Sequence, residues 1–141
     1  MRIGRYITVF GLGLAMFAAG WKSNEVTAAK SPRLSAKMLW KQELTDIKGK
    51  ELMVLELNVD PGAGSPAHKH PGHTVGYVIV GEFEIQIDDD PKQIFKAGEV
   101  FYEPDGVVHT LGRNPSETDS AKVVVFMLKD ADKPATMLHR H

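Results

Sequence analysis

Short apolar segments separated by glycine and proline follow one another from residue 38 to residue 128, and none has a helical period. The clearest is 77–87 (YVIVGEFEIQI), where apolar and polar side chains alternate with the period of two that a strand requires. Its apolar face is predicted to hold Tyr77, Ile79, Phe83, Ile85 and Ile87, opposite Glu82, Glu84 and Gln86. Gly81 interrupts the alternation and predicts a bulge or a sharp bend.

The remaining segments predict an all-β protein. Residues 60–72 and 88–92 are rich in glycine, proline and aspartate and predict a loop and a hairpin turn, and residues 131–141 predict a loose tail. Many short strands at regular spacing indicate a sandwich or a barrel. Further strands are predicted at residues 38–44, 51–59, 93–95, 99–102, 107–111 and 122–128.

The N-terminal residues have the order of a secretory signal peptide. Arg2 and Arg5 precede an uncharged, mostly apolar run at residues 7–20, and a polar stretch follows it. This run is shorter than the roughly 20 apolar residues that a membrane-spanning helix needs. We expect cleavage after Ala28, or alternatively after Gly20, and a periplasmic or extracellular location. An uncleaved N-terminal anchor is the other interpretation.

The composition excludes several kinds of site. The 141 residues include no cysteine, which rules out disulfides, a cysteine nucleophile and a thiolate zinc site. The formal net charge is −1 and no long basic run occurs, so nucleic-acid binding is not expected. The chain is 43% hydrophobic, enough to form a core without disulfides.

The histidines are unevenly placed. Of the six, three lie in the segment PAHKHPGHT, and His109 lies in EPDGVVHTLGRN. His68 and His70 are two residues apart, which puts both imidazoles on one face of an extended segment. Two imidazoles on one face and a third from a neighbouring strand would hold a metal ion from one side and leave the other side open.

Two ordered motifs surround these histidines. The first reads G-x5-H-x-H-x3-T-x6-G from Gly62 to Gly81, and the second reads G-x5-P-x-G-x2-H-x4-N from Gly98 to Asn114. Together they resemble the two motifs of the cupin superfamily, and the chain looks like a small single-domain bacterial cupin. The resemblance implies an all-β cupin barrel (a double-stranded β-helix, jelly-roll-like) and a homodimer.

The resemblance also implies a metal site. It assigns His68, His70 and His109 as ligands of a divalent metal ion, which could be Fe, Mn, Ni or Zn. The fourth ligand of the family, a glutamate, falls on Thr74, and a neutral hydroxyl is a poor ligand. Three outcomes are open: a three-histidine site with more open positions, recruitment of His73 as a fourth ligand, or loss of the metal.

The expected organisation is a signal peptide at residues 1–28, a connector and first strand at 29–48, the cupin barrel at 49–129 and a C-terminal tail at 130–141. The expected function is that of an exported, dioxygenase-like metal enzyme acting on a small oxygenated or anionic molecule. A non-catalytic binding or sensing module is the alternative. Isomerase or decarboxylase chemistry needs a placed acid or base, and the sequence does not single one out among Glu82, Glu84 and Glu103.

Overall fold

The computed structural model describes residues 31–139, and all the regular structure in this range is β-strand. The predicted signal peptide, residues 1–28, lies outside the described residues. Between residues 31 and 139 there is no helix long and apolar enough to cross a membrane. The prediction of an all-β fold is confirmed.

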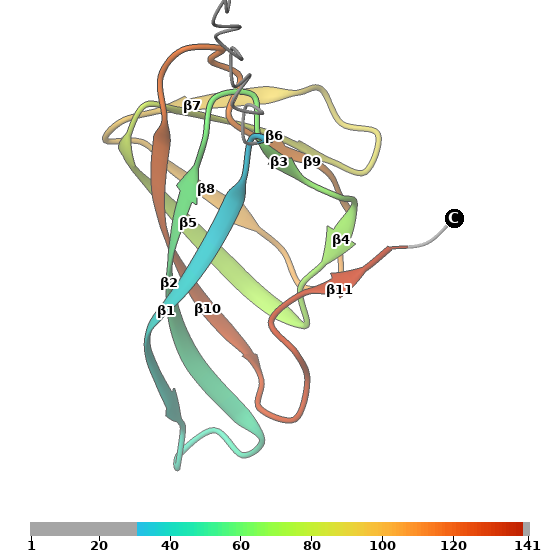
Figure 1. The fold of residues 1–141 in the computed structure, drawn as a ribbon. Coiled ribbons are helices and arrows are strands. Elements are labelled where there is room, and N and C mark those ends of the chain that lie inside the picture. Colours follow the sequence, from blue (N-terminus) through green and yellow to red (C-terminus); the bar gives the residue numbers. More distant parts are fainter. Residues whose placement is uncertain (1–30, 140–141) are drawn as a thin grey trace, which may run out of the picture.

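The strands form two sheets that face each other (Figure 1), and all the strand pairs are antiparallel. The first sheet has the order β1 (Leu34–Glu43), β2 (Lys50–Val59), β10 (Ala121–Asp130), β5 (Gly72–Val80) and β8 (Val100–Glu103). The second has the order β11 (Met137–Leu138), β4 (His68–Lys69), β9 (His109–Arg113), β6 (Glu82–Ile87) and β7 (Gln93–Lys96), and β3 (Gly64–Ser65) also pairs with β9.

Gly81 is the corner at which the chain leaves the first sheet and enters the second. Its φ of +74° lies in the left-handed region that favours glycine, so the predicted bend is confirmed. The bend also shifts the phase of the alternation, because β5 and β6 belong to different sheets. Val78 is therefore buried, and Tyr77 and Ile79 are exposed on the outer face of β5. The prediction that Tyr77 and Ile79 share the apolar face of β6 is wrong.

The hydrophobic core lies between the two sheets. One contact shapes it, because Gly76 of β5 pairs with Phe101 of β8 and a Cβ at residue 76 would lie 1.9 Å from the Phe101 ring. The missing side chain at residue 76 thus lets the ring lie across the inner face of the sheet. Burying a large apolar side chain contributes about 1.5–3 kcal/mol. The larger core residues are Met53, Val59, Val78, Phe83, Ile85, Phe101, Val123, Val125 and Met127.

The C-terminal segment differs from the predicted loose tail. Residues 137–138 form β11, which pairs with β4 (Figure 1), and the His139 N–H donates a hydrogen bond to the Ala67 carbonyl. β4 would otherwise be the edge of the second sheet, where unpaired backbone groups need a partner. The segment therefore completes the sheet beside the first-motif histidines.

Candidate metal centre

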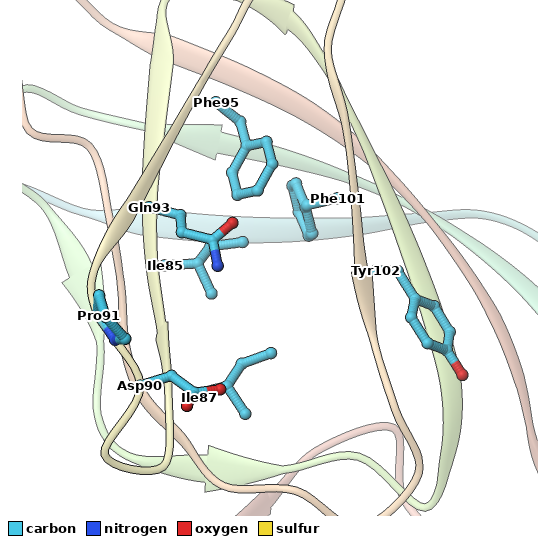
Figure 2. A pocket seen from close by; sticks show the side chains of 8 residues that line it. All are labelled: Ile85, Ile87, Asp90, Pro91, Gln93, Phe95, Phe101 and Tyr102. Atoms are coloured by element: carbon cyan, nitrogen blue, oxygen red, sulfur yellow. The ribbon is translucent and has the colours of Figure 1, made fainter.

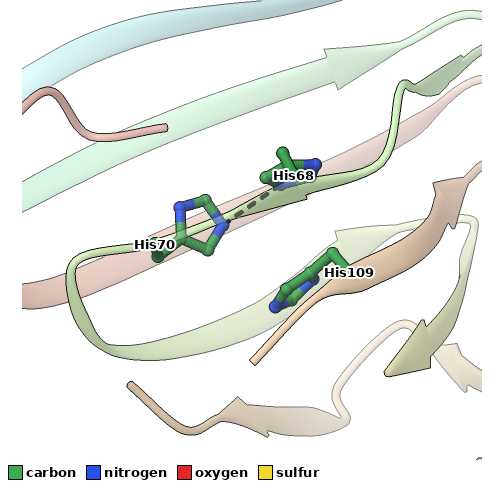
Figure 3. A group of neighbouring side chains, drawn as sticks. All are labelled: His68, His70 and His109. Carbon is green, nitrogen blue, oxygen red and sulfur yellow. Dashed lines mark hydrogen bonds between the residues drawn. The ribbon is translucent and has the colours of Figure 1, made fainter. Parts of the chain in front are cut away.

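The two strands that pair at the end of the second sheet bring three histidines together. His68 on β4 is the direct cross-strand partner of His109 on β9, and His70 follows β4 by one residue. The ring centroids lie 4.8 to 5.1 Å apart, and one nitrogen from each ring lies within 4.8 Å of the other two (Figure 3). His68 and His109 are buried, and His70 is mostly buried. The structure thus gathers the three residues assigned by the two motifs.

Hydrogen bonds fix which nitrogens of two of the rings carry protons. His68 Nδ1 lies 2.8 Å from the Pro66 carbonyl, and His70 Nδ1 lies 2.7 Å from the Ala135 carbonyl. Because a carbonyl oxygen only accepts, each Nδ1 is the donor, and in a neutral ring each Nε2 then carries a lone pair. The two Nε2 atoms lie 3.2 Å apart (Figure 3). Two lone pairs facing each other at this distance need a cation or a proton between them.

His109 offers a further free nitrogen. Its Nδ1 lies 3.1 Å from Glu103 Oε1, whereas its Nε2 is buried and finds no hydrogen-bond partner within residues 31–139. Burial, reinforced by His70 and His68, lowers the pKa of His109 to about 3, and burial also lowers the pKa of His70. Both rings are therefore neutral at pH 7, the form that binds metal. This donor set fits a divalent metal ion.

Glu103 is a site residue that the sequence did not single out. It is 5% exposed, and its Oε2 lies 3.5 Å from His70 Nε2. Burial raises the pKa of the Glu103 carboxyl to about 8, so in the metal-free protein it is mostly a neutral acid at pH 7. The available signal was the alternation of residues 100–103, which puts Glu103 on the same face as Phe101.

The structure separates the two further candidate ligands. Thr74 lies inside β5, is 1% exposed, and its Oγ1 has no hydrogen-bond partner in the described part of the chain. His73 is exposed on the opposite face, where its Nδ1 lies 2.7 Å from the Tyr102 hydroxyl and the two rings stack. The structure therefore does not bring His73 to the histidine cluster.

The other two glutamates considered as acids or bases pair with basic residues and not with the histidines. Glu82 lies 3.6 Å from Lys96, and Glu84 forms an ion pair with Arg113, its cross-strand neighbour. Both glutamates alternate with the inward-facing side chains of β6. Neither is placed to act in the metal centre.

A cavity of about 190 Å³ lies beside the histidines. The three histidines and Glu103 form its polar end, and Thr136 and Leu138 of the C-terminal segment form part of its wall. Most of the other lining side chains are apolar: Leu34, Ala36, Leu55, Leu57, Phe83, Phe101, Val125 and Met127. The arrangement suits a small molecule with one oxygen-bearing end and an apolar body.

A second, smaller cavity of about 50 Å³ lies against Phe101 and is shown in Figure 2. It is lined by Ile85, Ile87, Asp90, Pro91, Gln93, Phe95, Phe101 and Tyr102. This lining contains one carboxylate and no histidine, so it offers no set of metal ligands. The histidine cluster is the stronger candidate site.

Comparison with known proteins decides the family. A family model described as the cupin domain matches residues 55–127, which is more than half of the chain and contains both motifs. The chain belongs to the cupin family. The resemblance drawn from the two motifs is therefore confirmed, and with it the cupin type of the barrel. No protein with curated annotation matches the sequence of this cupin.

Solved structures share the cupin fold. A cupin-like protein from Thermotoga maritima MSB8 is 28% identical with a TM-score of 0.59, over 74% of this chain and 75% of that one. An RmlC-like cupin from Shewanella frigidimarina NCIMB 400 is 24% identical with a TM-score of 0.54, over 70% and 78%. The DMSP lyase DddQ from Ruegeria pomeroyi DSS-3 is 21% identical with a TM-score of 0.53; the match covers 62% of this cupin but only 42% of the lyase.

Proposed function

We propose that this cupin binds one divalent metal ion through Nε2 of His68, His70 and His109. The observation that carries the proposal is the pair of Nε2 lone pairs held 3.2 Å apart by hydrogen bonds on the far side of each ring. The buried Nε2 of His109, which has no partner among the described residues, supplies the third nitrogen. Hydrogen bonds from Nδ1 to backbone carbonyls orient metal-binding histidines in this way.

We further propose that the metal centre is catalytic and dioxygenase-like, acting on a small oxygenated or anionic molecule. Three neutral imidazoles leave a divalent ion with most of its charge, which favours an oxygen-bearing ligand from outside. A bound iron ion would supply open coordination positions and redox chemistry. The apolar wall of the cavity, including Leu55, Leu57 and Met127, would bind the body of the substrate and exclude water.

A second candidate function is metal-dependent isomerase, lyase or decarboxylase chemistry, and Glu103 favours it. This chemistry needs a placed acid or base, and Glu103 lines the cavity with a carboxyl whose pKa is raised to about 8 by burial. A carboxyl with a pKa of about 8 can both release and take up a proton close to neutral pH. The same cavity could also hold a metal or a ligand without any reaction.

One experiment separates these functions. The chain is produced with its own leader, the mature protein is purified, its metals are quantified, and oxygen uptake is followed with a panel of diketones, catechols and flavonols. Stoichiometric iron with oxygen consumption supports the dioxygenase. Metal with turnover of the panel in the absence of oxygen supports the second candidate, and metal without turnover supports a binding module. If the protein binds none of the ions of Fe, Mn, Ni and Zn, the proposed metal centre is wrong.

The location and the oligomeric state stay predictions. Export is tested by fractionating cells that carry the full-length chain and locating the mature form. The outer face of the first sheet carries exposed Trp40, Val75, Tyr102 and Phe126, and apolar patches of this kind mark interaction sites. Sedimentation of the protein and of Phe126→Glu tests the homodimer that the family resemblance implies.

A further inference from the structure

Thr74 leaves a gap in the ligand set at the position where the first cupin motif carries a glutamate. The residue points into the barrel and is almost fully buried, yet its hydroxyl makes no hydrogen bond within residues 31–139. A buried polar atom without a partner is uncommon and asks for an explanation. The Thr74 hydroxyl is therefore a polar group in the barrel interior that no group of the described chain satisfies.

The carboxyl nearest to this gap belongs to Glu103. In the β5–β8 pair Thr74 lies directly opposite Glu103, and directly paired side chains point to the same face about 4.5–5.5 Å apart at Cβ. Both residues face the barrel interior. A glutamate on β8 can therefore deliver its carboxyl to the space that a glutamate at position 74 of β5 would fill.

The Glu103 carboxyl lies close to two of the three proposed metal-binding histidines. Its Oε2 lies 3.5 Å from His70 Nε2, the nitrogen that faces His68, and its Oε1 lies 3.1 Å from His109 Nδ1. Two donor atoms bound to one ion at about 2.1 Å each are separated by about 3 Å in tetrahedral or octahedral geometry. The 3.5 Å between Oε2 and His70 Nε2 is therefore close to the separation expected for two ligands of one ion, and Oε1 lies beside the His109 ring.

Burial without a permanent cation argues against a purely structural role. In the described chain the ion-pair partners of Glu103 are the two histidines, with no lysine or arginine among them. A buried carboxylate without a positive partner is costly, so it is either protonated or neutralised by a bound cation. A metal ion on the three histidines would be that cation.

We propose that Glu103 replaces the missing glutamate of the first motif and is the fourth, anionic ligand of the metal centre, contributed from the neighbouring strand. The inference rests on the proposed metal site. It changes the expected charge of the loaded centre, because one carboxylate cancels one of the two positive charges. The centre would then select less strongly for anionic ligands than three histidines alone.

The test moves the carboxyl back to its family position. Affinities for Zn²⁺ and Co²⁺ are measured by competition with a chelator on the wild type, on Glu103→Thr, and on the double variant Thr74→Glu with Glu103→Thr. We expect Glu103→Thr to weaken binding at least 100-fold and the double variant to recover to within about 10-fold of the wild type. Glu84→Gln, which removes a carboxyl outside the cavity, is the matched control and should bind as the wild type does.

The visible spectrum of the Co²⁺ form gives a second readout, because its intensity and position change with the number and type of ligands. It should change in Glu103→Thr and return in the double variant. Unchanged affinity and spectrum in Glu103→Thr would overturn the inference while leaving the three-histidine site in place. Loss of affinity without recovery in the double variant would also overturn it, since Glu103 would then act only through its contact with His109. A wild type that binds neither ion contradicts the proposed function itself.

Discussion

Two clusters of buried polar side chains face the interior of this barrel, and they differ in whether they contain their own cation. The first is the ion pair between Glu51 and Lys129, cross-strand partners on β2 and β10 that are each 1% exposed. The second is the group formed by His68, His70, His109 and Glu103. The first contains its own lysine, and the second has no lysine or arginine partner within residues 31–139.

All three N–H groups of Lys129 have acceptors, and Glu51 has a second cation, Lys41, 3.2 Å from its Oε2. Lys129 Nζ lies 2.8 Å from Glu51 Oε1 and donates to the Asp130 and Lys133 carbonyls, each at 2.6 Å. The hydrogen bond from Lys129 outweighs burial and lowers the pKa of Glu51. Such a pair fastens the turn after β10 to the sheet, and its carboxylate already faces two lysines, Lys129 and Lys41. The difference between the clusters indicates which buried polar group is structural and which is prepared for an external ion.

The largest effect is expected from Lys129→Met. The change removes the buried partner of Glu51 and leaves it only the half-exposed Lys41, whose Nζ lies 3.2 Å from Glu51 Oε2. We expect a loss of about 3 kcal/mol of unfolding free energy, the lower end of the range for breaking a buried ion pair. Urea unfolding of the metal-free protein measures this. The double change Lys129→Met with Glu51→Leu replaces the whole pair by apolar side chains and should recover most of the loss. A loss of less than about 1 kcal/mol in the single variant would show that the charge of Glu51 does not depend on Lys129.

The opposite response is expected at the histidines. A ligand that binds only the folded state adds about 2.7 kcal/mol at a concentration 100 times its dissociation constant. Zn²⁺ at such an excess should therefore raise the unfolding free energy of the wild type by about this amount and leave that of His109→Ala unchanged. His73→Ala, which removes a histidine from the outer face, should respond as the wild type does. Equal stabilisation of His109→Ala would show that the metal binds elsewhere.

The difference between the clusters also explains what the sequence could predict. The three histidines lie in motifs whose spacing is fixed along the chain, so they were found without knowledge of the sheets. The role of Glu103 depends on the register between β5 and β8, which no local pattern states. The same limit applies to Tyr77 and Ile79, whose predicted face was wrong because the chain changes sheet at Gly81.

The C-terminal segment shows a related limit. Few apolar residues and no strong alternation mark residues 131–139, so a loose tail was the natural prediction. Its place is set by β4, whose free edge accepts β11, and by the Lys129 contact to the Lys133 carbonyl. Neither contact can be read from the local sequence, because β4 is distant in the chain and Lys129 would be expected on the surface.

The pH dependence of stability tests whether Glu103 is protonated in the metal-free protein. Its pKa is about 8 in the folded protein and about 4.5 when exposed, so between these values the folded state holds a proton that the unfolded state has released. The metal-free protein should therefore lose stability as the pH rises. From pH 6.5 to pH 8 the loss from Glu103 amounts to about 2 kcal/mol. The lowered pKa values of His109 and His70 offset a small part of it, because their unfolded-state imidazoles release their remaining protons just above pH 6.5.

Glu103→Gln keeps the shape of the side chain and removes the titration. The difference in unfolding free energy between Glu103→Gln and the wild type should be constant below about pH 4.5. Above this pH it should grow in favour of the variant up to pH 8. Urea midpoints at a series of pH values in the presence of a chelator measure the difference. Parallel profiles for the two proteins would mean that Glu103 is already ionised in the metal-free cavity.

The smallest effect is expected at the C-terminal segment, which links the two clusters. Lys129 holds the Lys133 carbonyl, and two residues further on the Ala135 carbonyl accepts the hydrogen bond from His70 Nδ1. Ending the chain at residue 134 removes this acceptor and β11 but keeps all three histidines and Lys129. Loss of a partner that orients a ligand weakens metal binding about 10-fold or more, so we expect a drop near the lower end of that range. A chain ending at residue 139 is the control and should bind Zn²⁺ as the full chain does. Equal affinity in the shorter chain would show that the β4–β9 pairing alone orients the histidines. The Glu51–Lys129 pair would then have no influence on metal binding by the histidines.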